Sequence, residues 1–148
     1  MKVVQAGIDI TKHSESCSLT AYCKKNDVPT IGWGNTYYKN GIKVKMGDKI
    51  TQAEADDLLA FIYDQTARSI VPFIKVKLSD NQFSALVDFT YNLGIDRLRK
   101  SSLLKKVNAN PQDVSIRDEF MKWIYKAGKI LPGLVTRRKA DADLYFTP

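Results

Sequence analysis

Carboxylates are the side chains of this sequence best suited to chemistry, because other common catalytic groups are scarce. The 148 residues include one histidine, His13, and two cysteines, Cys17 and Cys23. The sequence has no C-x-x-C or H-E-x-x-H motif, and Gly32-Trp-Gly34 lacks the third glycine and helix start of a phosphate-binding loop. A nucleophilic triad would have to use His13. The sequence therefore favours acid–base chemistry by carboxylates and predicts no metal and no cofactor.

Glu15 has the most suitable surroundings among the carboxylates. It lies between Ser14 and Ser16, at the expected end of the first helix and just before a segment rich in strand-forming residues. If two structural units shielded it there, desolvation would disfavour its ionised form, as a general acid requires. The alternative is an ordinary surface glutamate, which composition alone favours.

A short helix and a small β segment are expected on either side of Glu15. Apolar spacing predicts a helix over residues 3–13. Residues 18–46 are rich in Thr, Tyr, Val, Ile and Gly, and the Asn40-Gly41 turn precedes an alternating pattern over 42–45. This composition predicts an antiparallel segment of about three strands.

Helices are predicted from residue 51 to the end. Thr51-x-x-Glu54 and Ser79-x-x-Gln82 are capping boxes that predict helices over about 52–71 and from 79 to a stop at Gly94. Further helices are expected over 102–107, 112–127 and 133–146, with Gly128 as a stop. We predict one α+β, mainly α domain over 1–148. Its β lobe spans about 14–50, its larger helical lobe is built from about 51–148 plus the first helix, and the active-site cleft lies between them.

The charge distribution favours a polyanionic partner. The formal net charge is +7, and residues 1–50 and 101–148 each carry +4 whereas residues 51–100 carry −1. Nucleic acid, an anionic membrane face and an anionic cell-wall polymer all fit such a surface. The basic residues are scattered and no nucleic-acid-binding signature occurs, which counts against nucleic acid but leaves it among the candidates. The family resemblance described below removes it, so no nucleic-acid partner is expected.

The sequence predicts neither membrane insertion nor a disulfide. No stretch of about 18 apolar residues exists, and polar residues interrupt the N-terminus before a signal-peptide core could form. Cys17 and Cys23 lie six positions apart in a chain too large to depend on disulfides. We therefore expect reduced thiols and a cytoplasmic setting.

Two motifs around Glu15 carry a family resemblance. Glu15-Ser-Cys-Ser-Leu19-Thr-Ala21-Tyr22 is followed, after seven residues, by Thr30-Ile-Gly32-Trp-Gly34-Asn-Thr36. These resemble the phage-type lysozymes, the muramidase endolysins related to T-even phage lysozyme, whose pattern is E-G-x-x-L-x-A-Y followed by T-I-G-Y-G-H-T. The similarity continues in order and spacing over nearly the whole chain, at Ile50–Asp56, Asn81–Val87, Asn92-Leu-Gly94, Ser101–Leu104, Trp123 and Gly133–Arg138.

The resemblance implies a lysozyme-like fold and a specific reaction. Glu15 matches the proton donor to the glycosidic oxygen, and Thr30 matches the threonine beside the hydrolytic water. The implied reaction is inverting hydrolysis of the β-1,4 bond between N-acetylmuramic acid and N-acetylglucosamine in peptidoglycan, causing host cell lysis. The positions that match the lining of the glycan cleft are Thr36, Tyr91, Asn92 and Ser102; for Tyr91, a place in the core fits equally well.

The sequence departs from the family pattern at several positions. Lys24 stands where the family commonly has a second catalytic aspartate. Asp27, on the same loop, could replace that acid, or it could be a turn residue. Ser16 replaces the usual glycine after the glutamate, and Asn35 replaces the usual histidine, which we expect to affect packing more than chemistry.

Lys24 leaves two other interpretations open. A lytic transglycosylase cleaves the same bond with one acid/base glutamate and forms an anhydro end, but it would have no use for a water-holding threonine at position 30. A non-catalytic peptidoglycan-binding descendant of the fold would need no second acid.

The resemblance also implies how the protein meets peptidoglycan. Some relatives combine a cysteine near the glutamate with an N-terminal membrane signal; that signal is not found here, so we interpret both thiols as structural. The chain is then expected to accumulate as a folded monomer in the host cytoplasm. It would reach the periplasmic cell wall when a separate membrane-permeabilising protein opens the inner membrane.

Overall fold

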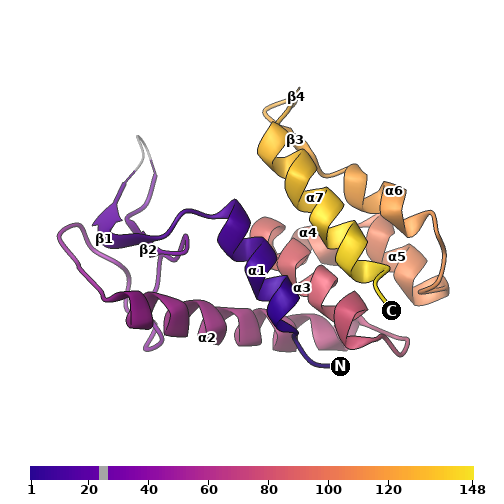
Figure 1. Cartoon of the computed structure of the whole chain (residues 1–148), viewed down its shortest axis with the longest axis horizontal. Helices are drawn as coiled ribbons and strands as arrows, with labels where there is room; N and C mark the ends of the chain where they lie inside the picture. Colours follow the sequence, from indigo (N-terminus) through magenta and orange to yellow (C-terminus); the bar gives the residue numbers. More distant parts are fainter. Residues whose placement is uncertain (24–26) are drawn as a thin grey trace.

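The computed structural model describes residues 1–23 and 27–148, which form a group of helices with two small antiparallel sheets at its periphery (Figure 1). In chain order the elements are α1 Gln5–Ser14, β1 Ser18–Tyr22, β2 Thr30–Gly32, α2 Gln52–Ile70, the 3-10 helix Val71–Phe73, α3 Asp80–Leu93, α4 Ile95–Lys100, α5 Ser102–Ala109, α6 Ile116–Met121, β3 Tyr125–Lys126, β4 Lys129–Ile130 and α7 Pro132–Tyr145. This arrangement confirms the predicted α+β, mainly α class.

The β lobe has its own small core. β1 and β2 pair antiparallel, with Ser18 opposite Gly32 and Tyr22 opposite Thr30. Ala21, Ile31 and Val44 form the buried cluster of this lobe, and Tyr38 and Ile50 pack against it. These apolar side chains hold the loops after β2 against the sheet.

The third strand predicted over 42–45 is not formed. This segment makes an isolated bridge between Tyr37 and Lys43 instead of a ladder. Gly41 and Gly47, both with positive φ, place turns at either end of it. Backbone hydrogen bonds join it to the preceding segment only from Tyr38 N–H to the Ile42 carbonyl and from Val44 N–H to the Thr36 carbonyl, and no regular strand forms, so the prediction was wrong here.

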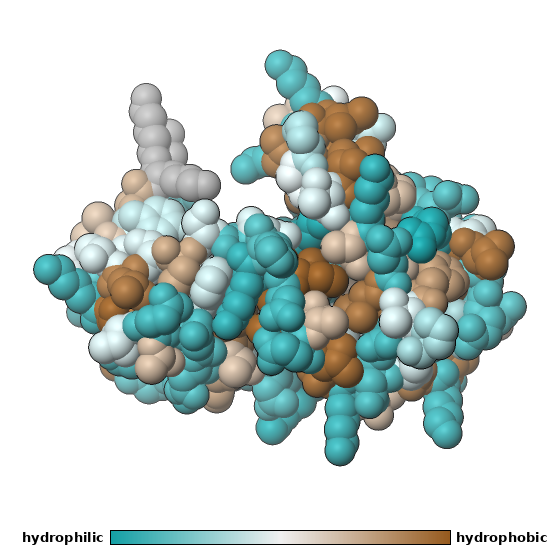
Figure 2. Space-filling view, in the orientation of Figure 1, coloured by the Kyte–Doolittle hydropathy of each residue, from teal (hydrophilic) through white to brown (hydrophobic). Residues whose placement is uncertain are grey.

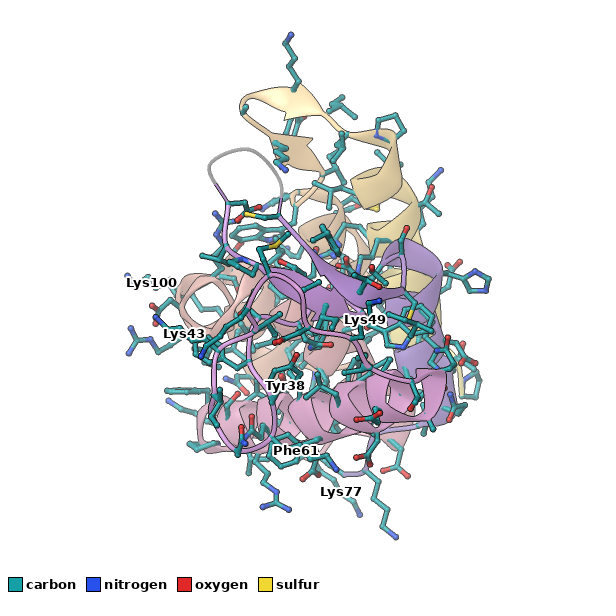
Figure 3. All side chains as sticks on the ribbon, turned by 90° about the vertical axis from the view of Figure 1, so that its left-hand side faces the viewer. Tyr38, Lys43, Lys49, Phe61, Lys77 and Lys100 are labelled. Carbon is teal, nitrogen blue, oxygen red and sulfur yellow. The ribbon has the colours of Figure 1, made fainter. Side chains whose placement is uncertain are left out.

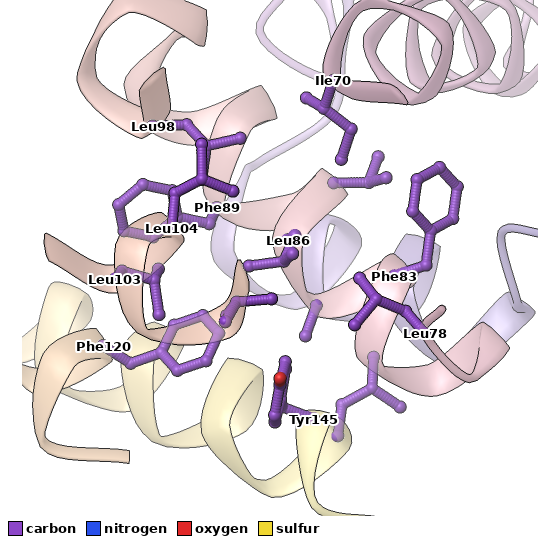
Figure 4. Packing of buried hydrophobic residues seen from close by; sticks show 14 of the residues in the cluster. Ile70, Leu78, Phe83, Leu86, Phe89, Leu98, Leu103, Leu104, Phe120 and Tyr145 are labelled. Atoms are coloured by element: carbon purple, nitrogen blue, oxygen red, sulfur yellow. The ribbon is translucent and has the colours of Figure 1, made fainter. Parts of the chain in front are cut away.

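The helical lobe is built around α3, in which every residue from Gln82 to Thr90 is buried. Figure 4 shows Leu86 and Phe89 of this helix surrounded by Leu98, Leu103, Phe120 and Tyr145 from the elements around it. The capping boxes predicted at Thr51 and Ser79 are both present, and they start α2 and α3 where the sequence indicated. α2 extends beneath both lobes and contacts β2 as well as α3 (Figure 1).

The helix predicted over 112–127 is wrong. Only Ile116–Met121 is helical, as α6, because the Asp113 side chain accepts hydrogen bonds from the backbone N–H and hydroxyl of Ser115 and holds a turn before it. Gly128 ends no helix. With Ala127, which also has positive φ, it makes the tight turn of the β3–β4 hairpin.

The short helix α4 was also missed, because Gly94 was interpreted as a stop alone. Gly94, with φ of 94°, ends α3 and is followed directly by α4.

Cys17 and Cys23 are both reduced. Within the described ranges, none of the helices has the length and apolar character needed to cross a membrane.

Candidate active site

Glu15 lies where α1 ends and the chain turns into the β lobe. Its backbone is extended, and its N–H closes the last turn of α1 by donating to the Thr11 carbonyl at 2.8 Å. The side chain is one-third exposed, and its Oε1 accepts a hydrogen bond from Nη1 of Arg137 at 3.0 Å. Glu15 is therefore oriented by a buried cation while part of its carboxylate faces solvent.

Arg137, on α7, forms a buried ion pair with Asp88 on α3. Its Nε donates to Asp88 Oδ2 at 3.0 Å and its Nη2 donates to Oδ1 at 2.9 Å, a two-pronged contact between planar groups. Burial acts to raise the pKa of Asp88, but the hydrogen bonds and charge of Arg137 outweigh it, so this pKa lies below its usual value. Asp88 is ionised at neutral pH, and the pair is a rigid support for Glu15.

Gly34 brings the β lobe against the other edge of Glu15. The turn after β2 is fixed by reciprocal backbone hydrogen bonds between Ile31 and Asn35 at 2.8 and 2.9 Å. Gly34 has φ of 89°, and a Cβ added to it would lie 3.4 Å from Oε2 of Glu15. A glycine here permits both the backbone conformation and the close approach.

A cleft of about 1010 Å³ opens at Glu15. Its walls come from α1, the end of α3, the N-terminal half of α7 and the β3–β4 hairpin, which contributes Tyr125, Lys126 and Ala127. In Figure 2 the surface is hollowed beside the apolar protrusion that lies where Figure 1 places this hairpin. Such a volume accommodates a substrate of several rings.

A second hollow of about 360 Å³ lies where the β lobe meets α2 and α3. Thr36 and Tyr91 line it together with Asn35. Asn35 is buried and its Nδ2 donates to the Tyr91 hydroxyl at 3.1 Å, while that hydroxyl donates to the Trp33 carbonyl at 3.0 Å. Burial raises the pKa of Tyr91 to about 12, so the hydroxyl keeps its proton for this bond. Asn35 thus links the β lobe to α3 through a hydrogen bond.

Comparison with known proteins gives this geometry a family. The family model described as Phage lysozyme matches residues 12–141. The chain belongs to the phage lysozyme family. It is 35% identical to the endolysin of Bacillus phage PZA over 98% of its own length and 55% of that protein, so the chain spans about half of that relative. It is 32% identical to the endolysin of Acyrthosiphon pisum secondary endosymbiont phage 1, with 98% of both chains covered.

A solved structure agrees over the whole fold. The endolysin from Escherichia coli O157:H7 phage FAHEc1 is 34% identical, covers 99% of this chain and 94% of its own, and has a TM-score of 0.87. The predicted family and its lysozyme-like fold are therefore confirmed.

The phage lysozyme fold places the predicted residues in different surroundings. Glu15 and Asn92 both line the larger cleft, and the side-chain Oδ1 of Asn92 accepts a hydrogen bond from Arg138 Nη2 at 2.5 Å. Thr36 and Tyr91 share the second hollow. Ser102 is exposed at the start of α5, and its hydroxyl donates to Glu119 Oε2 at 2.5 Å.

The remaining predicted site residues, Thr30 and Asp27, lie at the start of β2 and in the loop before it. Thr30 is half-buried, and its hydroxyl donates to the Val28 carbonyl at 3.0 Å. The Asp27 carboxylate is exposed and accepts from the Val28 N–H at 3.0 Å, which fits a turn residue. Lys24, the residue in place of the second acid, lies outside the described residues.

The sequence reasoning missed the support beneath Glu15. Arg137 was part of the family resemblance without a role, and Asp88 was not singled out. A signal was present, because Asp88 is a charged residue between Val87 and Phe89 in a strongly apolar helix, where an acid needs a buried partner. No group of three or more potential metal ligands occurs among residues 1–23 and 27–148.

Proposed function

We propose that this chain is an endolysin that hydrolyses the β-1,4 bond between N-acetylmuramic acid and N-acetylglucosamine in peptidoglycan, with Glu15 as the general acid. The observation that carries the proposal is the Glu15 carboxylate, which lines a cleft of about 1010 Å³, accepts a hydrogen bond from Arg137 and is bordered by Gly34. Membership of the phage lysozyme family and the name endolysin of its relatives support the same reaction.

The proposed mechanism gives each predicted residue a role. Glu15 donates its proton to the glycosidic oxygen as the bond breaks. Thr30, on β2, positions the water that attacks the sugar from the opposite face, which gives inversion. Asn92 in the larger cleft and Thr36 and Tyr91 in the second hollow contact the glycan, and Ser102 remains a predicted contact from the family pattern.

The decisive experiment is digestion of purified peptidoglycan followed by mass spectrometry of the released muropeptides. The wild type should release fragments with reducing muramic ends, and Glu15→Gln should lower the rate about a hundredfold to ten-thousandfold, the range for loss of a general acid. Asp143→Asn, an exposed acid-to-amide change on α7, is the matched control. Anhydro ends would indicate a transglycosylase, and binding without products would indicate a non-catalytic descendant.

Thr30 is tested with the nearly isosteric Thr30→Val. Loss of the water-positioning hydroxyl should slow hydrolysis by about tenfold to several hundredfold, with glycan binding retained. A wild-type rate in this variant would remove Thr30 from the mechanism. Asp27→Asn belongs to the same series: a comparable loss would assign the second-acid role to Asp27, and an unchanged rate would leave it as a turn residue.

We also propose that the protein acts on the wall from the host cytoplasm after a separate protein permeabilises the inner membrane. Expression in a Gram-negative host should leave the culture turbid until chloroform is added, and turbidity should then fall for the wild type but not for Glu15→Gln. Rapid lysis without chloroform would contradict this route.

A further inference from the structure

Three carboxyl groups and two guanidinium groups form one cluster beneath the cleft. The carboxyls belong to Glu15, Asp88 and Asp141, and the guanidiniums to Arg137 and Arg138. Asp88, Asp141 and Arg138 are fully buried, and Arg137 is 3% exposed. The two buried carboxyls are matched in number by the two buried guanidiniums, and the third carboxyl, Glu15, is one-third exposed, so the local surroundings of Asp88 and Asp141 decide which of them is ionised.

Asp141 is the buried carboxyl whose surroundings favour the protonated form. Burial raises the pKa of Asp141 well above its ordinary value, and the negative charge of Asp88 raises this pKa further. The opposing cation, Arg138, approaches Asp141 Oδ2 at 3.3 Å through its Nε. A neutral Asp141 and an ionised Asp88 leave Asp88 as the buried negative charge that faces Arg137.

Asp88 controls how Arg137 can approach Glu15. Its two oxygens occupy the Nε and Nη2 edge of the guanidinium, and Thr11 fixes the carboxylate by donating to Oδ1 at 2.5 Å. Because the guanidinium is planar, this contact also fixes the direction of Nη1, which is the atom that meets Glu15 at 3.0 Å.

The same contact resolves an electrostatic conflict. A cation 3.0 Å from a carboxylate favours the ionised form, whereas a general acid must keep its proton until the glycosidic bond breaks. The negative charge of Asp88, 2.9 Å from Arg137 Nη2, cancels much of the positive field that Arg137 exerts on Glu15.

We propose that Asp88 is a positioning residue for the reaction: it aims Arg137 at Glu15 and balances its charge, so that Glu15 can be both oriented and protonated. The inference rests on the proposed role of Glu15 as general acid. Besides the five members of the cluster, the titratable or charged groups that face it are Tyr63 on α2 and Tyr91 on α3, with Asp9, His13, Arg97 and Lys126 around the cleft.

The test compares two variants that differ at residue 88 alone. Asp141→Asn is the reference, because an amide mimics a protonated carboxyl and cannot ionise in place of Asp88. Adding Asp88→Asn keeps the shape of that side chain but removes its charge. Rates on soluble glycan fragments are measured from pH 4 to 9, and Asp143→Asn controls for an acid-to-amide change on the exposed face of α7.

The double variant should lose activity on the alkaline side at a pH about one unit lower than the reference, and its rate at pH 7 should fall about tenfold. The alkaline limb moves to lower pH because the charge of Arg137, no longer balanced by Asp88, stabilises the ionised form of Glu15, so that Glu15 loses its proton at lower pH. A purely structural role of Asp88 would lower the rate without moving this limb. An unmoved limb in a folded double variant overturns the proposal.

A second variant keeps the proposal testable if the double variant does not fold. Arg137→Gln removes the cation and should move the alkaline limb in the opposite direction, to higher pH, while lowering the maximal rate through loss of orientation. A limb that is unmoved or moves to lower pH in Arg137→Gln contradicts the proposal. Wild type and Glu15→Gln are measured alongside, since an inactive wild type or a fully active Glu15→Gln would overturn the general-acid role itself and not the role of Asp88 alone.

Discussion

At the scale of single residues, Gly34 shows how a backbone position shapes the candidate catalytic carboxylate. Its φ of 89° and the 3.4 Å from an added Cβ to Glu15 Oε2 predict that Gly34→Ala displaces Glu15. We expect the rate of peptidoglycan digestion to fall about tenfold or more, with a loss in unfolding free energy of about 1 kcal/mol.

Gly47→Ala is the matched control for this prediction. Gly47 has φ of 95° but no atom within 4 Å of an added Cβ, so the substitution adds the same kind of backbone strain without touching Glu15. Melting temperatures and digestion rates of both variants are compared. Equal rates for the two variants, at similar loss of stability, would mean that the contact with Glu15 is irrelevant.

How far single residues could be predicted depends on the range of the contacts involved. Glu15 stood out because its local surroundings and its motif both point to it. Arg137 did not, because its role comes from Asp88, 49 positions away, and Glu15, 122 positions away. A spacing rule within one helix cannot indicate which of several buried charges will meet across three helices, and packing decides this.

At the scale of elements, Glu119 joins α5 to α6. Its side chain is nearly buried and accepts hydrogen bonds from Ser102, from Lys122 at 2.9 Å and from Lys106, whose Nζ lies at 3.2 Å. Burial opposes ionisation, but these donors dominate and lower the pKa of Glu119 to about 2. The carboxylate therefore stabilises the folded state while it is ionised.

Glu119→Gln should lower the unfolding free energy at pH 7 by about 2 kcal/mol, a value that allows for screening of the two partly exposed lysines. A lowered pKa in the folded state means that this stabilisation is present above the unfolded pKa of about 4.5 and is lost as pH falls toward 2. The difference in melting temperature between wild type and variant should therefore shrink between pH 5 and pH 2.5. Asp118→Asn, an exposed change on the same helix, should show no such trend.

Elements with strong local signals were predicted well, and the others were not. The capping boxes of α2 and α3 fix helix starts within a few residues, so their positions follow from sequence. The region after α6 has no such signal: Gly128 is equally suited to end a helix or to form a hairpin turn. Ala127, with φ of 52°, shows that tertiary structure chose the hairpin against local preference.

At the scale of the whole molecule, the two lobes have separate cores and meet where Glu15 lies. The small cluster around Ile31 and the large one around Phe89 are distinct, and α2 contacts both lobes. The sequence predicted this division from a change in composition near residue 51. It could not predict the size of the cleft, because the β3–β4 hairpin that forms one wall was interpreted as helix.

The basic surface of the molecule leads to the last prediction, which concerns salt. Lys43 and Lys49 are exposed on the β lobe, on the side that faces the viewer in Figure 3, and Lys77 lies on the helical lobe at the lower edge of that view. If the protein acts on an anionic wall as proposed, its net charge of +7 attracts it there through long-range forces that salt screens. We expect lysis of intact walls to slow by about tenfold between low and about 0.3 M salt, whereas hydrolysis of short soluble glycan fragments changes by less than about twofold.

The double variant Lys43→Gln/Lys49→Gln should lower both the rate on walls at low salt and the salt sensitivity of that rate, because the attraction that salt removes is then smaller from the start. Lys75→Gln/Lys77→Gln carries the same change of charge on the helical lobe and should retain most of the salt dependence. If both double variants respond to salt alike, total charge steers the enzyme and the β lobe has no special part in reaching the wall.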